Sequence, residues 1–214
     1  MLPTLTPQAA TLRFYAQHAK EYFSQTAHLD VHCLYAPFLR EIRQGGRILD
    51  AGCGSGRDTK AFLERGYSVT AIDASPEMAR LATSFTNQEC AVMRIQDLSF
   101  HEEFDGIWAS ASLLHLPRAQ IHEALLRLHG ALKTTGILYI SLKEGRGEGV
   151  SRDGRFFCYY SRASFRQVLH RLPLRELQFW ESPGRKPDGS EDLWLNFLLK
   201  KARSIRVRGR NAPL

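Results

Sequence analysis

Glycines and carboxylates gather in one short segment whose spacing suits the binding of a nucleotide. Residues 48–58 read Ile-Leu-Asp-Ala-Gly-Cys-Gly-Ser-Gly-Arg-Asp, so an apolar run leads into Gly52, Gly54 and Gly56. Glycines let the backbone turn tightly and let a ligand approach, and the helix that follows presents unpaired N–H groups. Asp73 follows seventeen residues after Gly56, where a carboxylate can accept two hydrogen bonds from ribose hydroxyls.

Two classes of nucleotide cofactor use a strand, a glycine turn and a helix. A dinucleotide fold requires Gly-x-Gly-x-x-Gly. When this motif starts at Gly52, its third glycine position is occupied by Arg57, which would obstruct close helix packing. Asp50 stands immediately before the turn, where it would repel a pyrophosphate but favour the ammonium group of an amino acid. We therefore expect a nucleotide that carries an amino acid. A nicotinamide-dependent oxidoreductase and a binding protein without turnover stay open as alternatives.

The elements that must position these residues alternate between helix and strand. Strands are predicted at residues 47–51, 68–72, 91–95, 104–109 and 137–142, and helices at 11–26, 31–43, 57–65, 118–132 and 161–172. Ser75-Pro76 opens a further helix, because serine caps helices and proline suits the first helical position. Residues 174–180 and 193–199 flank a turn-rich segment and predict an antiparallel hairpin. The result is an α/β fold: a mostly parallel seven-stranded sheet with a C-terminal hairpin and helices on both faces.

Composition and charge exclude several classes of protein. The 214 residues suit one domain, and 24% charged with 10% aromatic residues excludes general disorder. Four cysteines without a Cys-x-x-Cys pair, and no cysteine–histidine cluster with zinc spacing, predict a reduced, cytoplasmic protein without a metal site. We expect no signal peptide and no membrane span. The oligomeric state, monomer or homodimer, stays open.

The net charge of +7 is unevenly distributed along the chain. Residues 200–214 carry no acid and six basic residues, Lys200, Lys201, Arg203, Arg206, Arg208 and Arg210. Residues 1–199 therefore have 23 basic and 22 acidic side chains, a net charge of +1. We expect a nearly neutral body and a flexible basic tail at 200–214, with phosphate contacts to RNA as an alternative role for the tail.

Several motifs resemble those of the class I S-adenosylmethionine-dependent methyltransferases. They are the glycine turn with Asp50, the strand-end Asp73, and Gln96-Asp97 after the third strand. Residues 132–136, Leu-Lys-Thr-Thr-Gly, resemble the Leu-Lys-Pro-Gly-Gly turn before the fifth strand of that family, with Thr134 and Thr135 replacing proline and glycine. Segments 56–59, 105–109 and 113–115 resemble the small single-domain bacterial members, the methyltransferase type 11 or tellurite-resistance-like group. The resemblance spans roughly residues 10–200, is most specific at 47–141, and implies a Rossmann-like methyltransferase fold.

The resemblance implies S-adenosyl-L-methionine as the cofactor and assigns its contacts. The glycine turn would hold the methionine part, Asp73 the ribose, and the end of the fourth strand would pass beneath the sulfonium. Arg57 would reach the cofactor carboxylate or else face solvent, and the two tyrosines of the first helix would close the site or simply pack in the core. The implied cofactor-binding residues are Tyr15, Tyr22, Asp50, Ala51, Gly52, Gly54, Arg57, Asp73, Ala74, Met78, Gln96, Asp97, Ala109 and Leu113.

Methyl transfer requires alignment, and it requires a base only when the acceptor must lose a proton. His115, after the fourth strand, is the candidate catalytic residue, with a structural histidine that bonds the loop backbone as the alternative. Residues 1–45 would form a helical cap over the cofactor and acceptor sites, and residues 46–199 the α/β core. The candidate substrate residues are Arg152, Arg155, Phe156 and Tyr159, with Arg185 and Lys186 of the hairpin turn facing the same opening.

Basic and aromatic side chains together suit a small anionic or aromatic acceptor. The Asn/Asp-Pro-Pro-Tyr/Phe box of many base-directed amino methyltransferases is absent, since residues 109–112 read Ala-Ser-Ala-Ser. A small-molecule acceptor is therefore the leading hypothesis. Methylation of a wobble-uridine modification of transfer RNA is the alternative within the same class.

Overall fold

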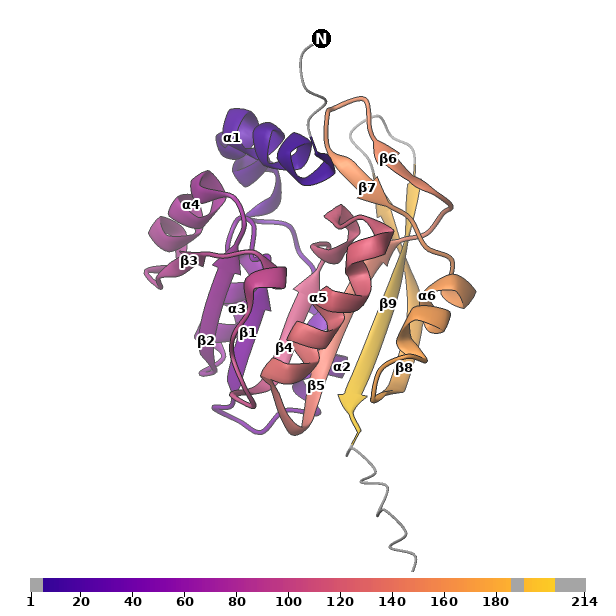
Figure 1. The fold of residues 1–214 in the computed structure, drawn as a ribbon. Helices are drawn as coiled ribbons and strands as arrows, with labels where there is room; N and C mark the ends of the chain where they lie inside the picture. The colour runs from indigo at the N-terminus through magenta and orange to yellow at the C-terminus, as the bar shows by residue number, and fades with distance from the viewer. Residues whose placement is uncertain (1–5, 186–190, 203–214) are drawn as a thin grey trace, which may run out of the picture.

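The computed structural model describes residues 6–185 and 191–202, and Figure 1 shows their arrangement. Seven strands form one sheet in the order β3-β2-β1-β4-β5-β9-β8. β1 to β5 run parallel, while β9 runs antiparallel to both β5 and β8. Their bounds are Arg47–Ala51 (β1), Ser68–Asp73 (β2), Cys90–Val92 (β3), Phe104–Ser110 (β4), Leu132–Lys143 (β5), Leu174–Arg185 (β8) and Glu191–Lys201 (β9). The predicted seven-stranded sheet with a C-terminal antiparallel hairpin is confirmed.

The order of the strands determines where a ligand can bind. β1 lies inside the sheet and pairs with β2 on one side and with β4 on the other. The chain therefore builds the sheet outward in one direction through β3 and then in the other through β4 and β5. In open α/β sheets, ligands bind beyond the carboxyl ends of the strands at such a reversal. The α1 helix (Pro7–Thr26) lies above that end of the sheet (Figure 1).

Helices cover both faces of the sheet because side chains along its strands alternate in direction. Ile48 of β1 packs in one core cluster with Phe38 and Phe62, which come from α2 (His32–Leu39) and α3 (Arg57–Glu64). Its neighbour Leu49 packs in the opposite cluster with Leu125 of α5 (Arg118–Ala131) and with residues of α6 (Arg162–Leu169). α4 (Pro76–Thr86) packs against β2 and β3.

Local sequence signals explain where several helices begin and end. The Ser75 hydroxyl accepts a hydrogen bond from the Met78 backbone N–H at 3.3 Å, with Pro76 at the first helical position, as expected. Ser161 forms a capping box at the start of α6. α2 is shorter than the predicted segment 31–43, because beyond Arg40 the backbone hydrogen bonds span three residues instead of four.

The structure corrects three boundaries. The connection predicted at 143–155 contains β6 (Glu148–Val150), which pairs with β7 (Phe156–Cys158) in a separate two-stranded sheet. β5 begins at residue 132 instead of 137, and its register with β4 shifts between Phe104 and Gly106. β3 ends at residue 92, so that residues 95–97 form a short 3₁₀ helix, η1 (Ile95–Asp97).

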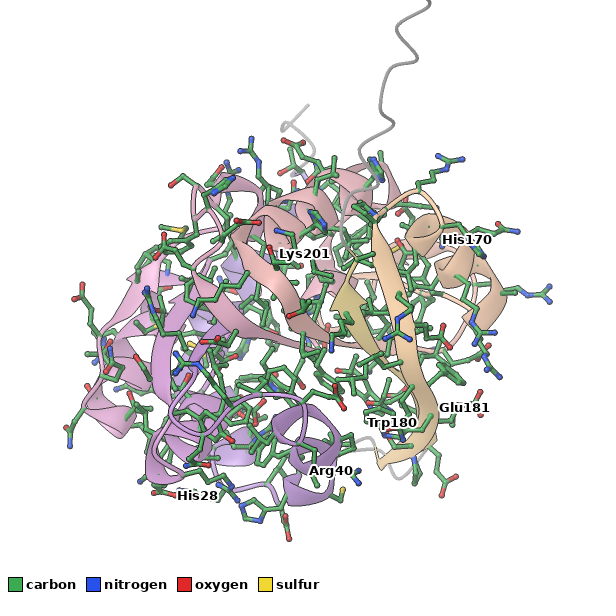
Figure 2. All side chains as sticks on the ribbon, turned by 90° about the horizontal axis from the view of Figure 1, so that it is seen from below. His28, Arg40, His170, Trp180, Glu181 and Lys201 are labelled. Atoms are coloured by element: carbon green, nitrogen blue, oxygen red, sulfur yellow. The ribbon has the colours of Figure 1, made fainter. Side chains whose placement is uncertain are left out.

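Lys200 and Lys201 belong to β9 and not to a flexible tail. Lys201 forms an ion pair with Glu102 at 3.1 Å and its Nζ donates to the Leu132 carbonyl at 2.7 Å, while Lys200 lies 4.0 Å from Glu41. Figure 2, seen from below, shows Lys201 at the end of the sheet opposite to α1. The remaining basic tail residues, Arg203, Arg206, Arg208 and Arg210, and Lys186 of the hairpin turn lie outside the described residues. No helix in the described ranges is both long and apolar enough to span a membrane.

Candidate cofactor and acceptor site

A cavity lies at the reversal point of the sheet, between the carboxyl ends of the strands and α1. Its walls come from α1, the glycine turn, the β2–α4 connection, η1, the loop after β4 and a second 3₁₀ helix, η2 (Leu113–His115). These segments are far apart in the sequence, and the parallel sheet brings them together at one edge. The sequence-predicted residues that line the cavity are Tyr15, Tyr22, Gly52, Gly54, Arg57, Asp73, Ala74, Met78, Gln96 and His115.

Two glycines of the turn serve different purposes. Gly52 has a φ of +88° and approaches the loop after β4 so closely that a Cβ atom would lie 2.5 Å from Ser112 Cβ. Gly54 has a φ of +53°, and the nearest atom to a Cβ there would be Tyr22 Cε1 at 4.0 Å. Gly52 thus allows the two loops to pack, whereas Gly54 leaves the backbone open toward the cavity, where a ligand can approach.

Asp73 ties the glycine turn to the end of β2. One carboxylate oxygen accepts the Gly54 backbone N–H at 2.8 Å, and the other accepts the Ser75 backbone N–H at 2.8 Å. Burial raises the pKa of Asp73, while these backbone donors act in the opposite direction. Because a carboxylate has four acceptor positions, acceptor capacity is left for a ligand such as a ribose hydroxyl.

Two buried carboxylates lie beneath the turn in different surroundings. Asp58 accepts hydrogen bonds from the Tyr35 hydroxyl at 2.6 Å and the Trp108 indole N–H at 2.7 Å, and Arg57 donates to it at 2.7 and 2.9 Å. Burial alone would raise the pKa of Asp58, but Arg57 and the other donors lower it. Asp50 accepts from the Thr59 hydroxyl at 2.6 Å, and burial followed by the charge of Asp58 raises its pKa.

Five of the implied cofactor residues do not line the cavity. Asp50 and Ala51 are buried beneath the turn, while Ala109 and Leu113 are fully buried in the core cluster that includes α5. Ala109 and Leu113 occupy the core-facing positions of β4 and η2, so the cavity wall consists of the residues between them, Ser110, Ala111 and Ser112. Asp97 is exposed and forms two hydrogen bonds with Arg94, at 2.6 and 2.7 Å.

The loop after β4 contributes a polar wall that the sequence motifs did not single out. Ala111 has a φ of +52°, and its backbone N–H donates to the buried Ser141 hydroxyl at 2.9 Å. The buried Ser112 Oγ has no hydrogen-bond partner among the described residues. An orphaned hydroxyl in the cavity wall, packed against Gly52 of the glycine turn, fits the polar amino-acid end of S-adenosylmethionine. The only sequence signal for it was the run of small residues at 109–112.

His115 connects three elements around the acceptor side of the cavity. Its Nδ1 lies 2.7 Å from the Phe156 carbonyl oxygen in β7, and its Nε2 lies 3.3 Å from the Tyr15 hydroxyl in α1. Burial lowers the pKa of His115 to about 4, with further lowering by the charges of Arg155 and Lys143. The contact with Phe156 matches the structural alternative considered for this residue, while the other ring nitrogen faces Tyr15, which lines the cavity.

The four candidate substrate residues lie behind the cavity wall or outside it. Arg155 packs over the rings of Phe14 and Phe157, at 4.7 and 5.1 Å from their centroids, and forms an ion pair with Asp153 at 2.5 Å. The Phe156 side chain is buried in the core, Tyr159 is half-buried, and Arg152 is exposed. Arg155, which was expected to attract an anion, is thus already paired, and the neighbouring Lys143 also contacts an aspartate, Asp192, at 2.5 Å.

Comparisons with known proteins agree with this geometry. Residues 48–136 match the family model of a methyltransferase domain. The chain is 27% identical over 169 residues to an uncharacterized methyltransferase of Staphylococcus carnosus, covering 78% of this chain and 79% of that protein. It is 32% identical over 105 residues to a ubiquinone biosynthesis O-methyltransferase of Xanthomonas campestris, covering 45% of this chain and 43% of that protein. The aligned part thus spans less than half of the latter relative.

Solved structures share the fold over nearly the whole chain. The 1,6-didemethyltoxoflavin-N1-methyltransferase of Burkholderia thailandensis, solved with 1,6-didemethyltoxoflavin and S-adenosylhomocysteine, has a TM-score of 0.72 at 22% identity and covers 95% of this chain and 93% of that one. The magnesium protoporphyrin IX methyltransferase of Synechocystis, with bound S-adenosylmethionine, has a TM-score of 0.71 at 15% identity and covers 92% of this chain and 99% of that one. At these identities the likeness concerns the fold.

Proposed function

The chain belongs to the class I S-adenosylmethionine-dependent methyltransferases, and on this basis we propose that it methylates a small aromatic molecule. The relatives named above act in ubiquinone biosynthesis and on didemethyltoxoflavin, which supports a small-molecule acceptor. The aromatic side chains around Tyr15 and Tyr22 support an aromatic one, because rings pack favourably edge to face. The paired states of Arg155 and Lys143 favour an aromatic acceptor over a highly charged anion.

The observation that carries the proposal is the link between Asp73 and Gly54. It places a buried carboxylate with free acceptor positions beside an open stretch of backbone, at the reversal point of the sheet. In our proposal Asp73 holds the ribose hydroxyls, and Ala74 and Met78 border the adenine. The N–H groups of Arg57 that do not bond Asp58 receive the cofactor carboxylate, and Gln96 meets the adenine amino group.

The remaining assignments follow from position. Asp50 and Ala51 support the glycine turn from below, and Ala109 and Leu113 support the loop after β4 from the core side. Tyr15 and Tyr22 close the cavity from α1. When bound, S-adenosylmethionine supplies an electrophilic methyl group on a sulfonium, so alignment with the acceptor provides much of the rate. His115 is the residue we propose to receive a proton from the acceptor.

Thermal unfolding with candidate cofactors tests the cofactor assignment. A ligand that binds only the folded state stabilises it by about 2.7 kcal/mol at a hundred times its Kd. We expect S-adenosylmethionine and S-adenosylhomocysteine to raise the Tm and NAD to leave it unchanged. A shift with NAD alone would favour the oxidoreductase and would contradict the proposal.

Transfer of a labelled methyl group tests the acceptor class. The protein is incubated with labelled S-adenosylmethionine and separately with phenols, heteroaromatic ring N–H compounds, carboxylates and bulk transfer RNA. We expect label on small aromatic molecules and none on the RNA. Labelling of transfer RNA with no labelled small molecule would favour the wobble-uridine alternative. S-adenosylhomocysteine binding without labelling of any acceptor would favour a binding protein without turnover.

A further inference from the structure

We propose that the methylated oxygen or nitrogen of the aromatic acceptor carries a proton, and that this proton leaves through the Tyr15 hydroxyl to His115. The inference rests on the proposed function and specifies its acceptor. It makes Tyr15 a catalytic residue that touches the reacting group, and His115 the terminal base. The direction of each hydrogen bond around these two residues carries the argument.

The main chain of Phe156 fixes the protonation of the imidazole. A carbonyl oxygen can only accept, so His115 Nδ1, at 2.7 Å from it, must carry the ring hydrogen. In the neutral ring, Nε2 is then an acceptor with a free lone pair. The Phe156 N–H donates at 2.9 Å to the buried Thr11 hydroxyl of α1, so this strand residue is held from both sides. The tautomer is therefore set by backbone that cannot easily move.

The same logic sets the direction of the Tyr15 hydroxyl. Because Nε2 accepts, the Tyr15 O–H must donate to it across 3.3 Å. The positive charge of Arg155 also acts on the Tyr15 hydroxyl. The lone pairs of the Tyr15 oxygen can still accept hydrogen bonds, and Tyr15 lines the cavity. The group that binds there has to be a donor, which a phenol or a ring N–H supplies and a carboxylate does not.

The charges that face this pair keep the imidazole neutral. Arg155, Lys143 and Asp153 act on His115, while Tyr22, Arg155 and Asp73 act on Tyr15. Arg155 and Lys143 are each paired with an aspartate, as described above. With its pKa lowered to about 4 by burial, His115 is in its base form at physiological pH. A base with such a low proton affinity suits an acceptor whose O–H or N–H is itself acidic.

The transfer balances in atoms and charge. The acceptor atom forms its bond to the methyl carbon with its own electron pair, while the bond from that carbon to sulfur breaks and its electrons stay on sulfur. The acceptor's proton passes to the Tyr15 oxygen, and the Tyr15 proton passes to His115 Nε2. The positive charge that disappears from sulfur thus appears on the imidazolium, which afterwards releases its proton to water.

The first test needs no acceptor. In the protein with ¹⁵N-labelled histidine, we expect the His115 Nδ1 resonance to show a bound hydrogen and Nε2 to resonate as an unprotonated, hydrogen-bonded nitrogen. Tyr15→Phe should move the Nε2 signal toward that of a free lone pair, whereas Tyr67→Phe, in the core beside α3, should leave it unchanged. A hydrogen on Nε2, or no response to Tyr15→Phe, would overturn the proposal.

The second test uses turnover. Tyr15→Phe and His115→Asn, whose amide can still donate to the Phe156 carbonyl, should each lower kcat for protonated phenols by about 10²-fold or more, the range of a general base. The kcat of both variants should return toward that of the wild type when the acceptor is a nitrophenol already ionised at the assay pH. A merely structural role of these residues would not predict this recovery. Tyr67→Phe should match the wild type.

Three results of this second test would overturn the proposal. They are full activity of Tyr15→Phe with protonated phenols, loss of activity only in His115→Asn, and equally fast methylation of aromatic carboxylates. The Tm shift with S-adenosylhomocysteine is recorded for every variant. If it is absent in the wild type, the proposed function itself fails, and the two failures are thereby distinguished.

Discussion

Asp50 and Asp58 are two buried carboxylates whose pKa values are shifted in opposite directions, upward for Asp50 and downward for Asp58. Asp58 receives four hydrogen bonds, whereas Asp50 receives one from Thr59 and faces the charge of Asp58. A carboxylate that is poorly solvated and close to another negative charge costs stability when ionised. The bound cofactor, with its ammonium group near the turn, would offset that cost. In our proposal, cofactor binding therefore stabilises the ionised form of Asp50.

Replacing Asp50 by asparagine should separate stability from binding. The pKa of Asp50 is raised in the folded state, so its stabilising contribution is present at low pH and is lost as the pH rises through the folded-state pKa. Asp50→Asn lacks this titration, and we expect its Tm to exceed that of the wild type increasingly toward alkaline pH. S-adenosylhomocysteine should bind it more weakly. A Tm difference that shrinks as the pH rises would contradict this account.

Asp73 should contribute directly to affinity. Asp73→Asn can still accept the Gly54 N–H with its carbonyl oxygen, but it loses the acceptor for the Ser75 N–H and the charge that strengthens bonds to ribose hydroxyls. Removing charged hydrogen bonds costs about 1.5–3 kcal/mol, so we expect the Kd for S-adenosylhomocysteine to rise roughly 10- to 150-fold by calorimetry. Asp105→Asn, which changes an aspartate in β4 that accepts the Arg47 N–H, serves as the control. Equal affinity of Asp73→Asn and wild type would remove Asp73 from the ribose site.

At the residue scale, sequence motifs located the turn and its acids but not every side-chain direction. Asp73 and Gly54 lie together as their spacing suggested. Asp97, which was expected beside the adenine, is instead exposed and paired with Arg94, three residues before it. A motif places a residue along the chain, but the direction of its side chain depends on neighbours such as Arg94 that compete for it. Ala109 and Leu113 failed to reach the cavity because they occupy the inward positions of β4 and η2.

At the scale of elements, α1 and the β6–β7 hairpin meet at one backbone unit. The Phe156 N–H bonds Thr11 of α1, and its carbonyl bonds His115 after β4. The helix, the hairpin and the candidate base therefore depend on each other's position. The helix α4, with its Ser75 cap, and the apolar strand β1 were predictable. The hairpin was not, because β6 consists of three exposed residues, Glu148–Val150, and shows no alternation.

Thr11 should be the residue through which α1 stabilises the β6–β7 hairpin at Phe156. Thr11→Val keeps the shape of the side chain but leaves the buried Phe156 N–H without an acceptor, which costs about 1–3 kcal/mol. We expect a lower free energy of unfolding in urea and faster amide hydrogen exchange at Phe156. Thr11→Ser, which retains the hydroxyl, should lose much less. Equal stability of the two variants would show that the hydrogen bond does not hold the hairpin.

At the scale of the whole molecule, the position of the last strand determines which charges belong to the fold. Lys200 pairs with Ile137 of β5, and Lys201 pairs with Leu174 of β8 and contacts Glu102. Residues 1–202 carry a net charge of +3, and Arg203, Arg206, Arg208 and Arg210 supply the other four charges. Sequence composition detected the basic segment but could not find its boundary, because lysines at a strand end look like the start of a tail.

Truncation at two neighbouring positions tests this boundary and the role of the four arginines together. A chain that ends at residue 202 should retain the Tm, the affinity for S-adenosylhomocysteine and the transfer of methyl groups to small molecules. A chain that ends at residue 199 loses both strand-end lysines, including the bond from Lys201 Nζ to the Leu132 carbonyl, and should unfold at a lower temperature.

Any affinity of the full chain for RNA should fall steeply between low and high salt and be absent in the 1–202 chain, because it would come from phosphate contacts of the arginines. If truncation at residue 202 abolished methylation of small molecules, the segment beyond β9 would have to be assigned to the acceptor site.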